Sequence, residues 1–280
     1  MMAESSNSTG LSRQRMMVLI RKEWRQALRD TSGLVPVILF PVLFSIVLPA
    51  LAVGVTVHSG LPGKWLHGLE PLLGLVSSVS GAGMGSQQLL VTAIVTYVFA
   101  PLILIIPVIV STSSATAAFV GERERGTLEG VLYGPITIRE LFLAKTLASV
   151  VPAVLLTWAA FLCFSIIVDA LAWPVMGGIV FPNATWIFAV LVLVPLIAFL
   201  VISVIVGVSN RAKSVQSAQG VAVFFVLPLM GMIVSQVAGA LLFDWRVVGL
   251  LGIVLAVLCV IVYFLVVARL IQSDEIVLKI

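Results

Sequence analysis

The residues with the clearest chemical meaning lie in the segment Gly121–Lys145, which separates two long apolar stretches. Its first charged residues alternate in sign, and they are Glu122, Arg123, Glu124 and Arg125. Side chains arranged in this way can form ion pairs with one another or with a partner protein. The pattern indicates noncovalent recognition of another protein rather than a covalent reaction.

The next part of this segment is predicted to form a short helix between two helix breaks. Gly126 weakens the helix that precedes it, Thr127 suits an N-cap, and Glu129 in the first turn favours the helix dipole. The apolar face of the short helix consists of Leu128, Val131 and Leu132. Gly134 and Pro135 end the helix. A soluble partner that binds here would move two membrane helices. The alternative is an ordinary loop whose charges only set the membrane topology, but that alternative does not explain the apolar face.

Residues that would support covalent chemistry are nearly absent. The sequence has no G-x-x-x-x-G-K-[ST] phosphate loop, no H-E-x-x-H and no G-x-S-x-G motif, so we expect no catalytic, cofactor-binding or metal-binding residues. Asp169 is the one acidic residue inside the apolar stretches, where an ion or transport role and a structural role at the water interface are the alternatives. His58 and His67 share one connecting segment, for which we favour a flexible outer loop with short re-entrant helices over a metal site.

The composition defines the class of protein that positions these residues. Of 280 residues, 61% are apolar and 10% are charged, and the mean hydropathy is +1.21. An average soluble domain is about 45–50% apolar and about 25% charged. A soluble enzyme, a nucleic-acid-binding domain and a disordered protein are therefore excluded, and the long unbroken apolar runs do not fit a membrane β-barrel. The fold class that remains is an all-α membrane protein.

Six apolar stretches are long enough to cross a bilayer core, which takes about 20 residues. They are approximately Leu34–Val57, Leu89–Val120, Thr146–Ala170, Trp186–Val208, Val221–Phe243 and Val247–Ala268. Pro101 and Pro107 predict a kink in the second stretch. Thr137 and Glu140 form a capping box that predicts the start of the third membrane helix.

The first thirty residues are predicted to differ from the rest of the chain. Residues 1–10 are polar and are expected to be disordered, whereas residues 11–30 form a basic amphipathic helix at the membrane surface. The apolar face of that helix consists of Met17, Ile20, Trp24, Ala27 and Leu28. A plain solvated helix is the alternative. Residues 31–280 form the six-span transmembrane domain.

The basic residues predict the orientation of the chain. Fourteen of the 16 Lys and Arg residues fall on one side of a six-span arrangement, and only Lys64 and Arg246 fall on the other. Cytoplasmic loops carry an excess of Lys and Arg. Both termini are therefore predicted to be cytoplasmic.

Two stretches carry features that permit bending and close helix approach. In the second stretch these are Pro101, Pro107 and the cluster Ser111–Ser114. In the fifth they are Pro228 and a stripe of small residues, Gly231, Ser235 and Gly239. Both stretches are candidates for lining a translocation path, and the stripe forms either a dimer face or a packing surface within one bundle.

The segment Glu122–Glu129, with Pro135 and the run Glu140–Lys145, resembles the signature of bacterial ABC transporter permeases of the type-2 family, related in fold to the ABCG subfamily. The resemblance implies that the segment contains a coupling helix, seated on a separate P-loop ATPase subunit that binds ATP and Mg. It also implies a second permease copy, identical or related, and a multi-pass location in a bacterial or archaeal cell membrane, with lipid but no nucleic acid as a partner. Gly130 departs from the bulkier residue often found there, and a glycine makes helix formation less favourable by about 1 kcal/mol.

The leading hypothesis is the permease subunit of an ATP-driven exporter, which moves its substrate outward from the cytoplasm or inner leaflet and is not itself an enzyme. A non-transporting membrane scaffold or immunity protein is the alternative, and an intramembrane enzyme is less favoured because polar catalytic groups are lacking. The nearly apolar spans mildly favour an amphiphilic or hydrophobic cargo.

Overall fold

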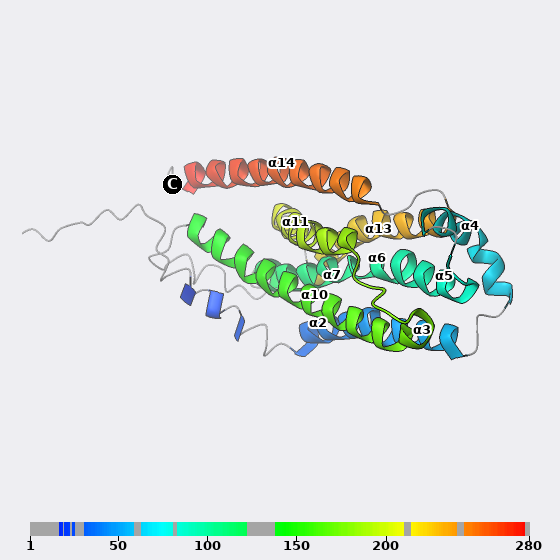
Figure 1. The fold of residues 1–280 in the computed structure, drawn as a ribbon. Helices are drawn as coiled ribbons and strands as arrows, with labels where there is room; N and C mark the ends of the chain where they lie inside the picture. Colours follow the sequence, from blue (N-terminus) through cyan, green and yellow to red (C-terminus); the bar gives the residue numbers. More distant parts are fainter. Residues whose placement is uncertain are drawn as a thin grey trace, which may run out of the picture.

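The computed structural model describes residues 17–18, 20–22, 24–25, 31–58, 63–80, 83–121, 138–209, 214–239 and 244–277. Within these ranges the chain is helical and contains no β-strand (Figure 1). Six helical segments are long and apolar enough to cross a membrane, which confirms the predicted number of spans. The spans are Leu34–His58, Ser86–Gly121, Leu143–Met176, Ala184–Val208, Val215–Val237 and Trp245–Leu265.

Several spans consist of more than one helical element. Span one contains α2 (Thr31–Val42), the π-helix η1 (Leu43–Val47) and α3 (Leu48–His58). Span two contains α5 (Ser86–Ala93), the π-helix η2 (Ile94–Phe99), α6 (Ala100–Leu102), α7 (Ile105–Ala115) and the π-helix η3 (Thr116–Gly121). Spans three, four and six lie in α10 (Ile138–Met176), α11 (Ala184–Ser209) and α14 (Trp245–Val277). Span five contains α12 (Val215–Gln219) and α13 (Val221–Val237), and α4 (Gly63–Ser80) lies between spans one and two.

Spans two and four form the centre of the bundle. In their most apolar windows 72% and 67% of the residues are buried, against 17% in spans one, five and six. α7 packs against α2, α10, α11 and α13, and α14 lies along one edge of the bundle beside α11 (Figure 1). The largest side chains of the core include Phe164, Phe181, Trp186, Leu193 and Ile202. The peripheral spans therefore direct most of their apolar surface away from the bundle.

The two ends of the bundle hold different elements. α4 lies at one end with the end of α3 and the start of α5, and the start of α10 and the end of α14 lie at the other (Figure 1). We call these the α4 end and the loop end. η3 packs against α10 at the loop end, so the segment between Gly121 and Ile138 joins two helices that are already in contact.

Span two is interrupted in the region of its two prolines, where the sequence predicts a kink. Proline has no backbone N–H and cannot donate to the carbonyl four residues before it. Ile103 and Leu104 form a turn between α6 and α7, just before Pro107. Before Pro101 the helix widens, because the Ala100 N–H donates to the carbonyl of Val95, five residues back. The interruption leaves polar backbone groups of span two available to side chains of other helices.

Span five ends earlier than the predicted limit at Phe243. The last α-helical residue is Val237, and Gly239 has a φ of +71°, in the left-handed region that glycine adopts most readily. A Cβ atom at Gly239 would lie 2.9 Å from the Cβ of Pro71 in α4. Glycine is therefore required both by the backbone and by the close approach of α4.

The segment between spans one and two contains one helix of 18 residues, α4, and not the short re-entrant helices that we predicted. Leu69, Leu72, Leu73 and Val76 recur at spacings of three and four, so one face of a single helix can be apolar. Leu72 and Val76 are buried with Ala93 of α5 in a small cluster. Packing of this face against span two explains why the segment is one continuous helix.

Candidate functional site

The predicted ATPase-coupling residues Glu122–Glu129, Val131 and Leu132 lie outside the described residues, as do Gly130, Pro135 and Thr137. Their two flanks are described. Gly121 is buried at the end of η3, where a Cβ atom would lie 3.8 Å from Cγ2 of Val215 in α12. α10 begins at Ile138, close to the helix start that the capping box predicts. The segment therefore connects the end of η3 to the start of α10.

Lys145 is the residue in this region whose surroundings the sequence did not reveal. Its side chain is only 2% exposed, and its Nζ donates a hydrogen bond to the Ala118 carbonyl at 2.7 Å. The ammonium group also lies 5.6 Å from the ring centroid of Phe119. A cation beside the last carbonyls of a helix satisfies backbone acceptors and interacts favourably with the helix dipole. Lys145 thus joins the first turns of span three to the end of span two.

Buried hydroxyl groups accompany this contact on the same two helices. Thr116 donates to the Thr112 carbonyl at 2.7 Å within span two. The hydroxyls of Ser111, Thr112 and Thr146 are buried and have no hydrogen-bond partner among the described residues. The predicted Ser111–Ser114 cluster is therefore split, because Ser111 and Thr112 face the core whereas Ser113 and Ser114 are partly exposed.

The remaining path candidates do not form one surface. Pro101 and Pro107 are buried in the centre of the bundle, whereas Pro228 and Gly231 are exposed on α13. Ser235 is partly buried, and Gly239 packs against Pro71 of α4. Gly231 has open space around it, so only this end of the small-residue stripe is available to another chain. The exposed face around it is apolar and includes Phe224, Leu227 and Val234.

Asp169 holds the loop that connects spans three and four. Its Oδ1 accepts hydrogen bonds from the backbone N–H groups of Val180 at 2.9 Å and Phe181 at 3.0 Å. Phe181 is fully buried and packs edge-on against Phe164, with ring centroids 5.0 Å apart. These bonds favour the structural alternative for Asp169, because its carboxylate positions a core aromatic residue.

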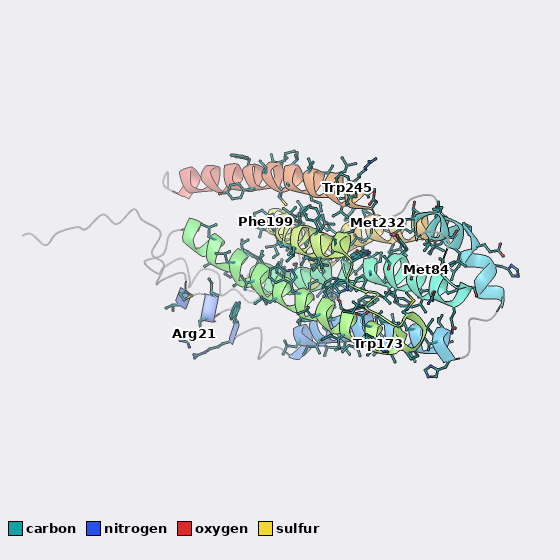
Figure 2. All side chains as sticks on the ribbon, viewed as in Figure 1. Arg21, Met84, Trp173, Phe199, Met232 and Trp245 are labelled. Atoms are coloured by element: carbon teal, nitrogen blue, oxygen red, sulfur yellow. The ribbon has the colours of Figure 1, made fainter. Side chains whose placement is uncertain are left out.

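Other side chains that the sequence analysis missed also pair with backbone carbonyls. Gln87 Nε2 donates to Thr56 and Val57 at the end of α3, and Gln88 Nε2 donates to Val175 at the end of α10. The last carbonyls of a helix lack partners within the helix. The two glutamines therefore join span two to the ends of spans one and three at the α4 end. In Figure 2, Met84 and Trp173 lie toward this end and Arg21 lies at the loop end.

Gln236 differs from these residues because its amide has no partner. Its side chain is 0% exposed, and neither Nε2 nor Oε1 has a hydrogen-bond partner in the described part of the chain. The residue lies in α13, one turn before the Gly239–Pro71 contact. A buried amide without partners costs free energy.

A comparison with protein families decides the identity of the fold. The family model described as ABC-2 family transporter protein matches residues 17–247. The chain belongs to the ABC-2 transporter family. No curated protein and no solved structure matches it. It is a multi-pass membrane permease of an ABC transporter, a component that is typically noncatalytic in this family.

Proposed function

We propose that this chain is the permease of an ATP-driven exporter and that a separate ATPase subunit binds the segment between η3 and α10. The observation that carries the proposal is the Lys145–Ala118 hydrogen bond, which fixes span three to span two beside that segment. A force on the segment would act on both helices together. Since span two lies at the centre of the bundle, its displacement would reach every span that packs against α7.

ATP and Mg belong to the partner subunit in this proposal. The permease sequence has no P-loop motif that could cradle nucleotide phosphates. Both termini and the coupling segment face the cytoplasm, in keeping with the fourteen basic residues on that side. The substrate moves outward from the cytoplasm or the inner leaflet, and the apolar spans favour an amphiphilic molecule such as a lipid or peptide.

A second permease copy completes the path. The exposed apolar face of α13 and the open space at Gly231 are compatible with close approach of another helix. Spans one and five have largely exposed apolar windows, so the single chain does not bury the surfaces that would border a path. The route lies at the interface of the two copies, with the exposed face of span five as one wall and the partly exposed Ser113 and Ser114 of span two on another.

The decisive test is copurification with the ATPase subunit after removal of the predicted apolar face. Changing Leu128 and Leu132 to Ser removes two side chains whose burial is worth about 1.5–3 kcal/mol each, so binding should weaken at least about a hundredfold. Val79→Ser with Ile179→Ser is the matched control, since both residues are exposed, 65% and 79%, away from the coupling segment. Wild-type copurification and coupled ATPase activity in the Leu128/Leu132 variant would overturn the coupling assignment.

The orientation is tested with single cysteines at positions 64 and 125, after Cys163 and Cys259 have been replaced. A membrane-impermeant thiol reagent added to intact cells should label position 64 and leave position 125 unlabelled. Labelling at position 125 from outside the cell would contradict the orientation.

A further inference from the structure

A hydrogen bond from Trp24 connects the N-terminal segment to span three. The described residues of this segment are Met17, Val18, Ile20, Arg21, Lys22, Trp24 and Arg25. The indole Nε1 of Trp24 donates to the carbonyl of Ala148 at 2.9 Å, across 124 positions of sequence. Ala148 is 5% exposed, whereas Trp24 is 40% exposed. A peripheral side chain therefore reaches a buried backbone group of a membrane span.

The Ala148 carbonyl needs this donor because of the residue four positions later. In an α-helix the carbonyl of residue 148 would accept a hydrogen bond from the N–H of residue 152. Residue 152 is proline, which has no N–H. A backbone carbonyl without a partner is costly at membrane depth. Trp24 supplies the hydrogen bond that Pro152 cannot, and its indole N–H is a donor only.

The same combination occurs a second time, in the core. In η2 the N–H of Ala100 donates to Val95, five residues back. At the same spacing of five residues, the Thr96 carbonyl would accept a hydrogen bond from the N–H of residue 101, but residue 101 is also proline and has no N–H. Trp186 Nε1 donates to that Thr96 carbonyl at 3.1 Å. Trp24 and Trp186 therefore each donate to a carbonyl that a proline leaves without its helical donor.

The Trp24–Ala148 contact lies in the same turn of α10 as the contact between spans two and three. Ala148 follows Lys145 by three residues, so the two lie within one turn of α10. Lys145 bonds to Ala118 of span two, and Ala148 accepts from Trp24 of the N-terminal segment. One turn of span three is thus attached to two other parts of the chain. This turn begins seven residues after Ile138, the first described residue beyond the predicted coupling helix.

We propose that Trp24 and Pro152 form a latch that ties the N-terminal segment to span three, so that displacement of the coupling segment moves the N-terminal segment together with spans two and three. Trp24 is a positioning residue, since it acts through the Ala148 carbonyl. The latch itself is independent of the proposed function, whereas its displacement by an ATPase subunit rests on that function.

Trypsin cleavage after Arg21, Lys22 and Arg25 measures how often the segment is released, because cleavage follows the population of the open form. The full-length chain in detergent is compared with three variants: Trp24→Phe, Pro152→Ala and the double variant. Trp24→Phe removes the donor, and Pro152→Ala gives Ala148 a backbone donor within its own helix. Each single change should raise the cleavage rate about fivefold to tenfold, the effect of one lost hydrogen bond.

The double variant distinguishes the latch from two unrelated effects. If Trp24 and Pro152 act through one carbonyl, the double variant should cleave no faster than the faster single variant. Trp173→Phe is the control for Trp24→Phe, because Trp173 is also an exposed tryptophan. Pro195→Ala is the control for Pro152→Ala, because Pro195 also lies inside a membrane helix. Both controls should leave the cleavage rate unchanged. Cleavage of Trp24→Phe within twofold of wild type, or multiplication of the two single effects, would overturn the latch.

The transmission of movement is tested in the complex with the copurified ATPase subunit. Addition of ATP should change the cleavage rate at Arg25 in the wild-type complex and should leave it constant in the Trp24→Phe complex. An unchanged rate in the wild-type complex would overturn the transmission. The cleavage assay without ATPase would still decide the latch, so failure of the proposed function and failure of the latch give different results.

Discussion

The indole–carbonyl bonds of Trp186 and Trp24 share one chemistry but lie in different surroundings. Trp186 is 0% exposed and joins spans four and two inside the core, whereas Trp24 is 40% exposed and joins a peripheral segment to span three. Release of Trp186 would open the centre of the bundle, whereas release of Trp24 would disturb few buried side chains. The comparison teaches that the same pairing can serve as a buried core contact in one place and as an exposed peripheral contact in another.

This difference extends to the two ends of the molecule. At the α4 end, Asp169, the Gln87 and Gln88 amides and the Gly239–Pro71 contact connect the ends of several spans. At the loop end, the described contacts of Lys145 and Trp24 converge on one turn of span three. In the proposed coupling, movement that enters at this turn would reach span two and the N-terminal segment.

The largest expected effect is at Trp186. Trp186→Phe leaves the buried Thr96 carbonyl without its donor and removes part of a fully buried ring system, so the free energy of unfolding should fall by about 2–4 kcal/mol. Trp24→Phe should lower the free energy of unfolding by less than about half of that amount. Thermal unfolding of both variants in the same detergent measures the difference. An equal loss of stability in the two variants would remove the distinction between core and peripheral bonds.

The second prediction concerns the small-residue stripe of span five. Gly239→Ala places a side chain in a left-handed backbone position, which costs about 1–2 kcal/mol, and directs it against Pro71. Gly231→Ala is the matched change in open space within α13, and it should be neutral or stabilise the monomer by up to about 1 kcal/mol. Thermal unfolding should therefore separate the two variants. Similar stabilities would show that the α4 contact does not constrain span five.

Spans two and five also show how far the sequence predicts the structure. The six spans follow from the length of the apolar runs, and the break in span two follows from Pro101 and Pro107, because both are local consequences of residue type. The sequence predicts a later end for span five than the structure shows, since the apolar run continues past Val237 to Phe243. Only the contact with Pro71 reveals why Gly239 ends it.

The polar contacts were less predictable than the helices. A proline four residues after Ala148 marks a free carbonyl in the sequence itself. The donor that reaches it is 124 residues away, and no local pattern connects the two. The sequence identifies Lys145 only as a basic residue of a connecting segment, because nothing in its neighbours shows that span two covers it. Local chemistry thus identifies unsatisfied groups, whereas the tertiary fold selects their partners.

The third prediction separates the two roles proposed for Asp169. Asp169→Leu removes the acceptor for two backbone N–H groups and should lower the free energy of unfolding by about 1–3 kcal/mol. Asp169→Asn keeps a carbonyl oxygen in place, so its loss should be about 1 kcal/mol or less. Transport by the Asp169→Asn variant, normalised to folded protein, should match wild type. Full stability with complete loss of transport would instead assign the carboxylate to ion or substrate movement.

The smallest expected effect, and the one of opposite sign, is at Gln236. Its buried amide has no partner among the described residues, so Gln236→Leu removes two unsatisfied groups while keeping a similar volume. Replacement of an unpaired polar group by an apolar one is neutral or stabilising, and we expect a gain of up to about 1 kcal/mol. Gln236→Glu is the matched polar variant, which retains the volume but adds a carboxyl group that has no more partners than the amide. In thermal unfolding of the isolated permease, the midpoint temperature should be highest for Gln236→Leu, intermediate for the wild type and lowest for Gln236→Glu. A loss of stability in the Leu variant would mean that the amide is paired in the folded protein, and span five would then belong with the directed contacts of the α4 end rather than with the apolar periphery.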